Sequence, residues 1–257
     1  MRSGEHLCYV ALGDSQTEGV GDGDDTVGLR GFADRLAEHL TAVDPGVRYA
    51  NLAVRGRLAG QVRAEQLEPA LALRPDVASV VAGVNDLLRP RFDVVEVTRH
   101  LEEMFAALTA SGARVVTVTF PDVGRIAPLA RPLRARVLDF NAHVREAAAR
   151  QGVAVADTAL AAVATDPRLW NADRLHAGPL GHARIAAACA EALRLPGSDA
   201  SWALPLPPRP APTVARAAVA EVRWAAGFLG PWLGRRLRGR SSGDGRGAKR
   251  PELLPVG

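Results

Sequence analysis

The sequence is poor in several features that would each define a class of protein. It has only two cysteines, Cys8 and Cys189, so it cannot build the disulfide framework typical of small secreted domains. Both lie in apolar surroundings, and we expect buried free thiols in a reducing compartment. No apolar run reaches the roughly 18 residues that a membrane span needs, and the first residues lack the apolar core of a secretory signal. These absences predict a cytoplasmic protein.

Lysine is almost absent as well, because Lys249 is the only one among 32 basic residues. The net charge of +4 is unevenly distributed along the chain. Residues 196–257 hold ten basic and four acidic residues, whereas residues 1–195 carry a net charge of −2. The first 195 residues show no basic surface interleaved with aromatic residues, which argues against nucleic acid as a partner.

The chain does contain enough apolar material for a sizeable core, with 47% hydrophobic and 23% charged residues among 257. Short apolar runs alternate with stretches of helical periodicity, and this alternation predicts an α/β fold with a five-stranded parallel sheet covered on both faces. The strands are expected at residues 7–12, 47–52, 77–82, 113–120 and 153–157, and the helices at 31–42, 60–73, 94–110, 132–150 and 180–195.

The sequence changes character after residue 195, where we expect the first domain to end. Residues 196–212 predict a proline-rich linker, residues 213–240 a basic amphipathic helical extension, and residues 241–257 a disordered tail. Two interpretations of the extension remain open. In the first, the extension docks on the body or stays solvated. In the second, it lies peripherally on a membrane surface. Membrane contact would place three aromatic side chains in the lipid interface, Trp224, Phe228 and Trp232. It would place four arginines at anionic headgroups, Arg223, Arg235, Arg236 and Arg238.

Four polar segments stand at functionally informative places in the predicted fold. Gly13-Asp14-Ser15, residues 51–56 and residues 83–86 follow the first three strands, and residues 173–176 precede the last helix. In parallel α/β sheets, ligands bind beyond the carboxyl ends of the strands. We therefore expect the four segments to meet at one edge of the sheet.

The residue types in these segments suit the cleavage of an acyl bond. Serine needs a base to take its proton, and a histidine held by a carboxylate is the usual solution. Ser15, His176 and Asp173 can fill these roles. Backbone N–H groups and amide side chains can stabilise the negative oxygen that forms during attack. Taken singly, each segment is also compatible with an ordinary turn or a helix cap.

The oxyanion donors predicted by this interpretation are the N–H groups of Ser15 and Gly56 and the side-chain amide of Asn85. We interpret Asp14 as a hydrogen-bond acceptor that fixes its own loop, and Asp86 as a helix cap.

In this set of segments the chain resembles the SGNH hydrolases, also called GDSL-type esterases and lipases. The Ser, Gly, Asn and His blocks correspond to ALGDSQTEG, NLAVRG, GVNDLL and DRLHAGPLGH, and the resemblance covers roughly residues 7–193. It implies a flavodoxin-like three-layer α/β/α sandwich and a catalytic domain over residues 1–195. It also implies a Ser15–His176–Asp173 triad and an oxyanion hole of Ser15, Gly56 and Asn85. No metal or other cofactor is needed, in agreement with the lack of a phosphate loop or a Cys/His cluster.

Within the resemblance, Gln16 stands where many relatives carry an apolar or small residue, and we expect it to shape the mouth of the pocket. His182, inside the last helix pattern, is expected to be structural.

The function predicted is a GDSL-type carboxylic ester hydrolase that acts on a small-molecule or lipid ester through an acyl-enzyme. An acyltransferase or O-deacetylase acting on a sugar or lipid would use the same residues. A non-catalytic binding module is a third alternative, although no expected catalytic position is missing.

Overall fold

The computed structural model describes residues 6–210, 213–231, 234 and 241–256. Its main element is a six-stranded sheet in the order β7-β6-β5-β1-β4-β8. The first five of these strands pair in parallel. Their bounds are β1 Cys8–Gly13, β4 Arg48–Asn51, β5 Val77–Val81, β6 Arg114–Val118 and β7 Ala154–Ala156. In chain order this is the 2-1-3-4-5 arrangement of flavodoxin-like sheets, so the predicted fold class is confirmed.

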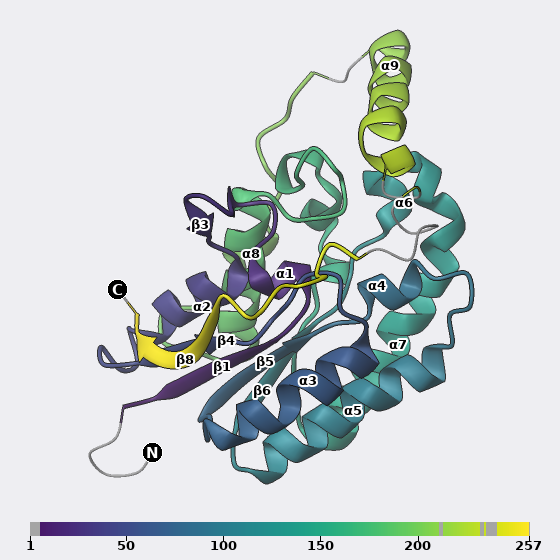
Figure 1. The fold of residues 1–257 in the computed structure, drawn as a ribbon. Helices are drawn as coiled ribbons and strands as arrows, with labels where there is room; N and C mark the ends of the chain where they lie inside the picture. The colour runs from purple at the N-terminus through teal and green to yellow at the C-terminus, as the bar shows by residue number, and fades with distance from the viewer. Residues whose placement is uncertain (1–5, 211–212, 232–233, 235–240, 257) are drawn as a thin grey trace.

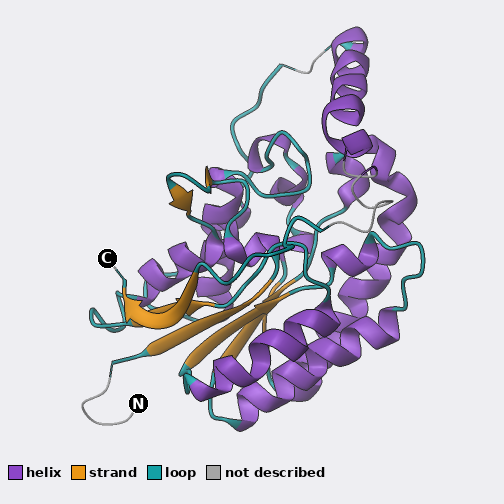
Figure 2. Ribbon diagram, viewed as in Figure 1, coloured by secondary structure: helices purple, strands orange, loops and turns teal. Residues whose placement is uncertain are grey.

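Helices cover both faces of the sheet and complete the three layers (Figures 1 and 2). One face is covered by α3 (Ala59–Ala72), α5 (Val94–Ala110) and α7 (Arg134–Gln151), and the other by α2 (Phe32–Leu40) and α8 (Pro179–Ala192). Each face has its own apolar cluster, with Phe105 and Phe140 fully buried on the first and Phe32 fully buried on the second. Such packing explains why the parallel strands read as continuous apolar runs in the sequence.

Short elements lie at the edge of the sheet where the parallel strands end. They are the helices α1 (Ser15–Glu18), α4 (Val84–Leu87) and α6 (Val123–Ile126), and a small hairpin of β2 (Gly23–Asp24) and β3 (Gly28–Leu29). Short 3-10 helices occur at Pro128–Leu133, Thr158–Leu160, Ala162–Thr165, Pro167–Leu169 and Ala200–Ala203.

The C-terminal extension differs from the prediction in its last part. Residues 250–255 form strand β8 (Arg250–Pro255), which pairs antiparallel with β4, so the expected disorder of residues 241–257 is wrong for this segment. The sequence hides the strand because Pro251 and Pro255 break the usual strand pattern. Prolines are tolerated on an edge strand, where part of the backbone needs no ladder partner. The guanidinium of Arg250 lies over the Tyr49 ring, 5.4 Å from its centroid, and anchors the strand.

The middle of the extension is helical, as expected. Helix α9 (Val214–Trp224) continues into a π-helical turn at Ala225–Leu229 and projects beyond the sheet in Figure 1. The stretch before it contacts the body, since Arg184 donates to the Ser201 carbonyl at 2.7 Å and Arg168 to the Pro207 carbonyl at 2.8 Å. Several positions of the predictions lie outside the described residues: linker residues 211 and 212, and Trp232, Leu233, Arg235, Arg236 and Arg238 of the helical extension. Among the described residues, the helices are too short or too polar for any to cross a bilayer.

Candidate active site

Ser15 is the first residue of α1, directly after β1. The turn from strand to helix brings the backbone of Gly13 so close to its neighbours that a Cβ there would lie 2.4 Å from the Val81 carbonyl oxygen. The buried side chain of Gln66 on α3 holds this turn. Its amide accepts from the Gly13 N–H at 2.8 Å and donates to the Gly13 carbonyl at 2.9 Å. The Ser15 segment (residues 13–18) is thus fixed to the sheet and to a core helix.

A continuous hydrogen-bond chain joins Ser15 to the loop before α8. The Oγ of Ser15 lies 2.9 Å from Nε2 of His176, and Nδ1 of His176 lies 2.7 Å from a carboxylate oxygen of Asp173. In the tautomer with its proton on Nδ1, His176 donates to Asp173 and accepts from the serine hydroxyl. The structure therefore brings together the three side chains that the sequence analysis selected, although 158 residues separate Ser15 from Asp173.

The carboxylate of Asp173 also organises its own loop, the His176 loop (residues 171–177). Its second oxygen accepts from the N–H groups of Leu175 at 2.9 Å and of His176 at 3.0 Å. Burial by itself raises the pKa of Asp173, but the hydrogen bonds from His176 and these N–H groups outweigh it, so the pKa lies below its ordinary value. Asp173 is therefore ionised at neutral pH and can stabilise a protonated His176.

Gln16, the residue after Ser15, ties the Ser15 segment to the His176 loop. Its side chain is buried, donates to the Leu175 carbonyl at 2.9 Å and accepts from the Ala177 N–H at 3.3 Å. The amide thus holds the backbone on both sides of His176. This placement corrects the expectation that Gln16 shapes the pocket mouth, since its polar atoms are used inside the protein.

Residues 51–56 bond to the Ser15 segment through Asn51, whose amide donates to the Thr17 carbonyl at 2.8 Å. Asn85 connects the remaining segment. Its amide nitrogen donates to a carboxylate oxygen of Asp14 at 3.0 Å and to the Arg57 carbonyl at 3.1 Å. The four segments of the sequence analysis thus converge at one edge of the sheet. Both amide hydrogens of Asn85 have acceptors in this arrangement, so donation to a ligand would require one of them to be shared or released.

The backbone N–H groups expected to donate to an oxyanion differ from the Asn85 amide in their hydrogen bonding. Among the hydrogen bonds of the described residues, the N–H groups of Ser15 and Gly56 have no acceptor. Gly56 has a φ of 79°, and a Cβ there would lie 2.3 Å from the Ser241 hydroxyl. The C-terminal extension therefore packs directly against this loop.

Asp14 precedes Ser15 in the chain, but its carboxylate bonds to Gln16 and Asn85 and not to the triad side chains among the described residues. It is buried and accepts from the Gln16 N–H at 3.3 Å as well as from Asn85, in agreement with its expected role in fixing the loop. Burial raises the pKa of Asp14 to about 7, and the hydrogen bond from Gln16 only partly opposes this. The pKa values of Asp14 and Asp173 are thus shifted in opposite directions.

Neighbouring polar residues support these loops. Glu18 forms a buried ion pair with Arg55 at 2.7 Å and links α1 to the Gly56 loop. Asp86 accepts from the Ala59 N–H at 3.0 Å and so caps α3. His182 is fully buried and bonded to the Phe32 N–H and the Val20 carbonyl, and burial lowers its pKa to about 4.

Helix α9 reaches the His176 loop from outside. The indole N–H of Trp224 donates to the Asp173 carbonyl at 2.7 Å. Arg174, whose φ of 57° is unusual for a residue other than glycine, pairs with Glu221 and lies 5.2 Å from the Trp224 ring centroid. Sequence analysis assigned no such role to Trp224, Gln16 or Gln66. Only Gln66 carried a signal, because it shares a buried row of helix positions with the apolar residues Val62 and Ala70.

Comparisons with known proteins identify the family. The family model for the GDSL-like lipases and acylhydrolases matches residues 11–184, so the chain belongs to this family of esterases and acylhydrolases. A search of curated proteins found no match.

Solved structures show the same fold at low identity. LAE5, an alpha/beta hydrolase enzyme from the metagenome of Lake Arreo, Spain, is 23% identical over 74% of this chain and 95% of its own, with a TM-score of 0.61. Axe2, an acetylxylan esterase from Geobacillus stearothermophilus, is 21% identical over 75% and 96%, also with a TM-score of 0.61. TesA is 22% identical over 73% and 98%, again with 0.61. Further matching structures are catalytic mutants of Axe2 in which a serine, a histidine or an aspartate is replaced by alanine.

Proposed function

We propose that this enzyme hydrolyses carboxylic esters with Ser15 as nucleophile, His176 as general base and acid, and Asp173 as the carboxylate that orients His176. The observation that carries the proposal is the hydrogen-bond chain from Ser15 Oγ to Nε2 of His176 and from its Nδ1 to Asp173, at 2.9 and 2.7 Å. The catalytic serine, histidine and aspartate mutants of Axe2 support the same combination of side chains.

The reaction has two steps in this proposal. Ser15 attacks the ester carbonyl while His176 takes the hydroxyl proton, and His176 then gives this proton to the leaving alcohol. Water, activated by His176, attacks the acyl-enzyme and releases the acid. The ionised Asp173 stabilises the imidazolium that forms in each step, in accord with its lowered pKa.

The N–H groups of Ser15 and Gly56 would donate to the negative oxygen of each tetrahedral intermediate. The amide of Asn85 would join them by sharing a hydrogen that it now gives to Asp14 or to Arg57. Loss of one such donor typically lowers the rate by about 10²–10³.

The test of this function is Ser15→Ala assayed with short p-nitrophenyl esters. We expect a loss of kcat of ~10⁴ or more, because the nucleophile is removed, with an unchanged circular dichroism spectrum. A mutant that retains the wild-type rate would refute the assignment.

The acyl acceptor and the acyl group need separate measurements. Acetylated xylo-oligosaccharides belong in the substrate series because Axe2 is an acetylxylan esterase. Partition of the products with and without a candidate alcohol distinguishes hydrolysis from acyl transfer, since the same acyl-enzyme serves both reactions.

A further inference from the structure

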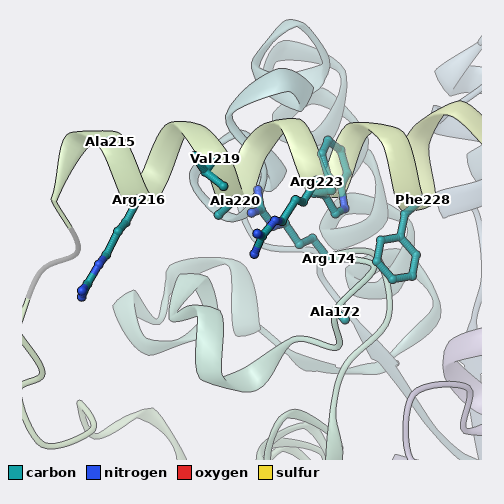
Figure 3. Close-up of a pocket in the computed structure, with 9 residues that line it drawn as sticks. Ala172, Arg174, Ala215, Arg216, Val219, Ala220, Arg223 and Phe228 are labelled. Atoms are coloured by element: carbon teal, nitrogen blue, oxygen red, sulfur yellow. The ribbon is translucent and has the colours of Figure 1, made fainter.

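A groove lies between α9 and the part of the His176 loop that holds Ala172 and Arg174 (Figure 3). Its volume is about 590 Å³, which lies in the range of small-molecule sites. Ala172 and Arg174, the neighbours of Asp173 in the chain, form one side. The other side comes from α9 and the turn that follows it. The groove therefore shares its wall with the loop that carries Asp173.

The charges in the groove are of one sign. Arg174, Arg216 and Arg223 line it, and in Figure 3 the side chains of Arg216 and Arg223 extend from α9 on the side that faces the loop. Arg174 is paired with Glu221. Among the ion pairs of the described residues, none involves Arg216 or Arg223, and both are exposed. Two guanidinium groups are thus available to a ligand.

The rest of the lining is apolar. Val219 and Phe228 remain 50% and 42% exposed although they face the groove. Trp224 and Ala220 lie between them along the helix. A small anion alone would leave these side chains in water, whereas a purely apolar ligand would leave the arginines without partners. The lining matches a ligand that combines an apolar part with an anionic group.

We propose that this groove binds a phosphate-type anion carried on an apolar stem, with Arg216 and Arg223 on the anion and Val219 and Phe228 on the stem. Guanidinium groups bind phosphate oxygens through paired, charge-assisted hydrogen bonds, which favours phosphate over a neutral headgroup. Such a ligand is either a free amphiphile or a lipid whose headgroup reaches the groove from a bilayer.

The place of the groove links ligand binding to the proposed triad, and this link rests on the proposed function. Trp224 forms part of the groove and donates to the Asp173 carbonyl, so a ligand held there lies against the back of the proposed triad. Ligand binding would then act on the position of Asp173, and through Asp173 on His176.

Binding of octyl phosphate tests the proposal, measured by calorimetry with the full-length Ser15→Ala protein so that hydrolysis does not enter. Octyl glucoside, which has the same stem and a neutral head, and inorganic phosphate, which has no stem, are the reference ligands. We expect octyl phosphate to bind at least about tenfold more tightly than either. Arg216→Gln/Arg223→Gln should abolish this difference. The matched control Arg63→Gln/Arg99→Gln, which removes the same charge from α3 and α5, should preserve it.

Co-sedimentation with phosphatidylcholine vesicles, with and without phosphatidylglycerol, identifies the source of the ligand. Arginine-dependent binding of octyl phosphate supports a free amphiphile, and arginine-dependent binding to the anionic vesicles alone supports a bilayer lipid. The proposal is overturned if neither probe binds better than its neutral counterpart. It is also overturned if the groove variant and the control variant lose binding equally. Neither result would alter the assignment of Ser15, which depends on hydrolysis alone.

Discussion

The Ser15 segment and the His176 loop contribute the two ends of one hydrogen-bond chain, but they are held in different ways. The Ser15 segment continues a buried strand, and Gln66 on a core helix fixes both polar groups of Gly13. The His176 loop belongs to no strand or helix. It is held by the amide of Gln16 from one side and by Trp224 of α9 from the other.

The two regions differ in which part of the sequence determines their geometry. The first segment is placed mainly by local sequence, since an apolar strand and a tight turn bring Ser15 to the sheet edge, and one distant side chain, that of Gln66, holds the turn. The loop is placed by single polar contacts from distant parts of the chain. We therefore expect changes in the two regions to affect different properties, and the predictions that follow separate them.

The first prediction concerns Asp14, the buried carboxylate of the Ser15 segment. Burial raises the pKa of Asp14 in the folded protein to about 7, from an ordinary value of 3.8. Its contribution to stability is fully present below the unfolded pKa and is lost as the pH rises through the folded one. Asp14→Asn removes this dependence. As the pH rises from the unfolded pKa of Asp14 to its folded pKa, the unfolding free energy of the wild type should therefore fall relative to that of the mutant, by up to ~4 kcal/mol.

Urea unfolding at a series of pH values between the two pKa values measures this difference. Asp24→Asn is a control of opposite sign, because hydrogen bonds from the N–H groups of Val27 and Thr26 lower the pKa of Asp24. The stability that Asp24 contributes is lost as the pH falls. A difference between wild type and Asp14→Asn that does not change with pH would contradict the buried, proton-binding state of Asp14.

The second prediction concerns the connection between the two regions. Gln16→Leu keeps the size of the side chain but removes both hydrogen bonds to the backbone that flanks His176. We expect kcat to fall by about 10–100-fold with little change in KM, because the base is misplaced and the substrate contacts are not. The readout is kcat and KM measured across a range of pH. If Gln16 contributed to stability alone, its replacement would leave the pH profile of kcat unchanged.

Gln61→Leu is the matched control, since Gln61 makes a single hydrogen bond to the Leu58 N–H at the exposed start of α3. It should retain wild-type kcat. Equal losses of kcat in the two variants would mean that Gln16 does not position His176.

The smallest expected effect belongs to the contact from α9. Trp224→Phe preserves an aromatic ring beside Arg174 but removes the donor to the Asp173 carbonyl. We expect kcat to fall by at most about tenfold, since one hydrogen bond to a partly exposed loop is lost. Steady-state kinetics measures the effect. Trp202→Phe, which removes an indole donor to Glu191 away from the loop, serves as the control. An unchanged kcat for Trp224→Phe would show that the hydrogen bond from Trp224 does not position the loop.

Much of this architecture was predictable from the sequence, for reasons that differ by region. The five parallel strands are short apolar runs between helical periods, and their carboxyl ends locate Ser15, Gly56 and Asn85. His176 and Asp173 were identifiable because their spacing allows one turn to hold both. The contact of Trp224 with Asp173 was not predictable, because it joins residues 51 apart that share no periodic pattern. Strand β8 was missed because its prolines and the polar segment before it look disordered.

The proposed nucleophile is the central claim, and covalent labelling tests it most directly. A fluorophosphonate phosphonylates an activated serine with loss of fluoride, and the mass of the intact protein reports the adduct. We predict one adduct on the wild-type protein, located on Ser15 by peptide mapping, and none on Ser15→Ala. An adduct at another residue, or equal labelling of both proteins, would contradict the account.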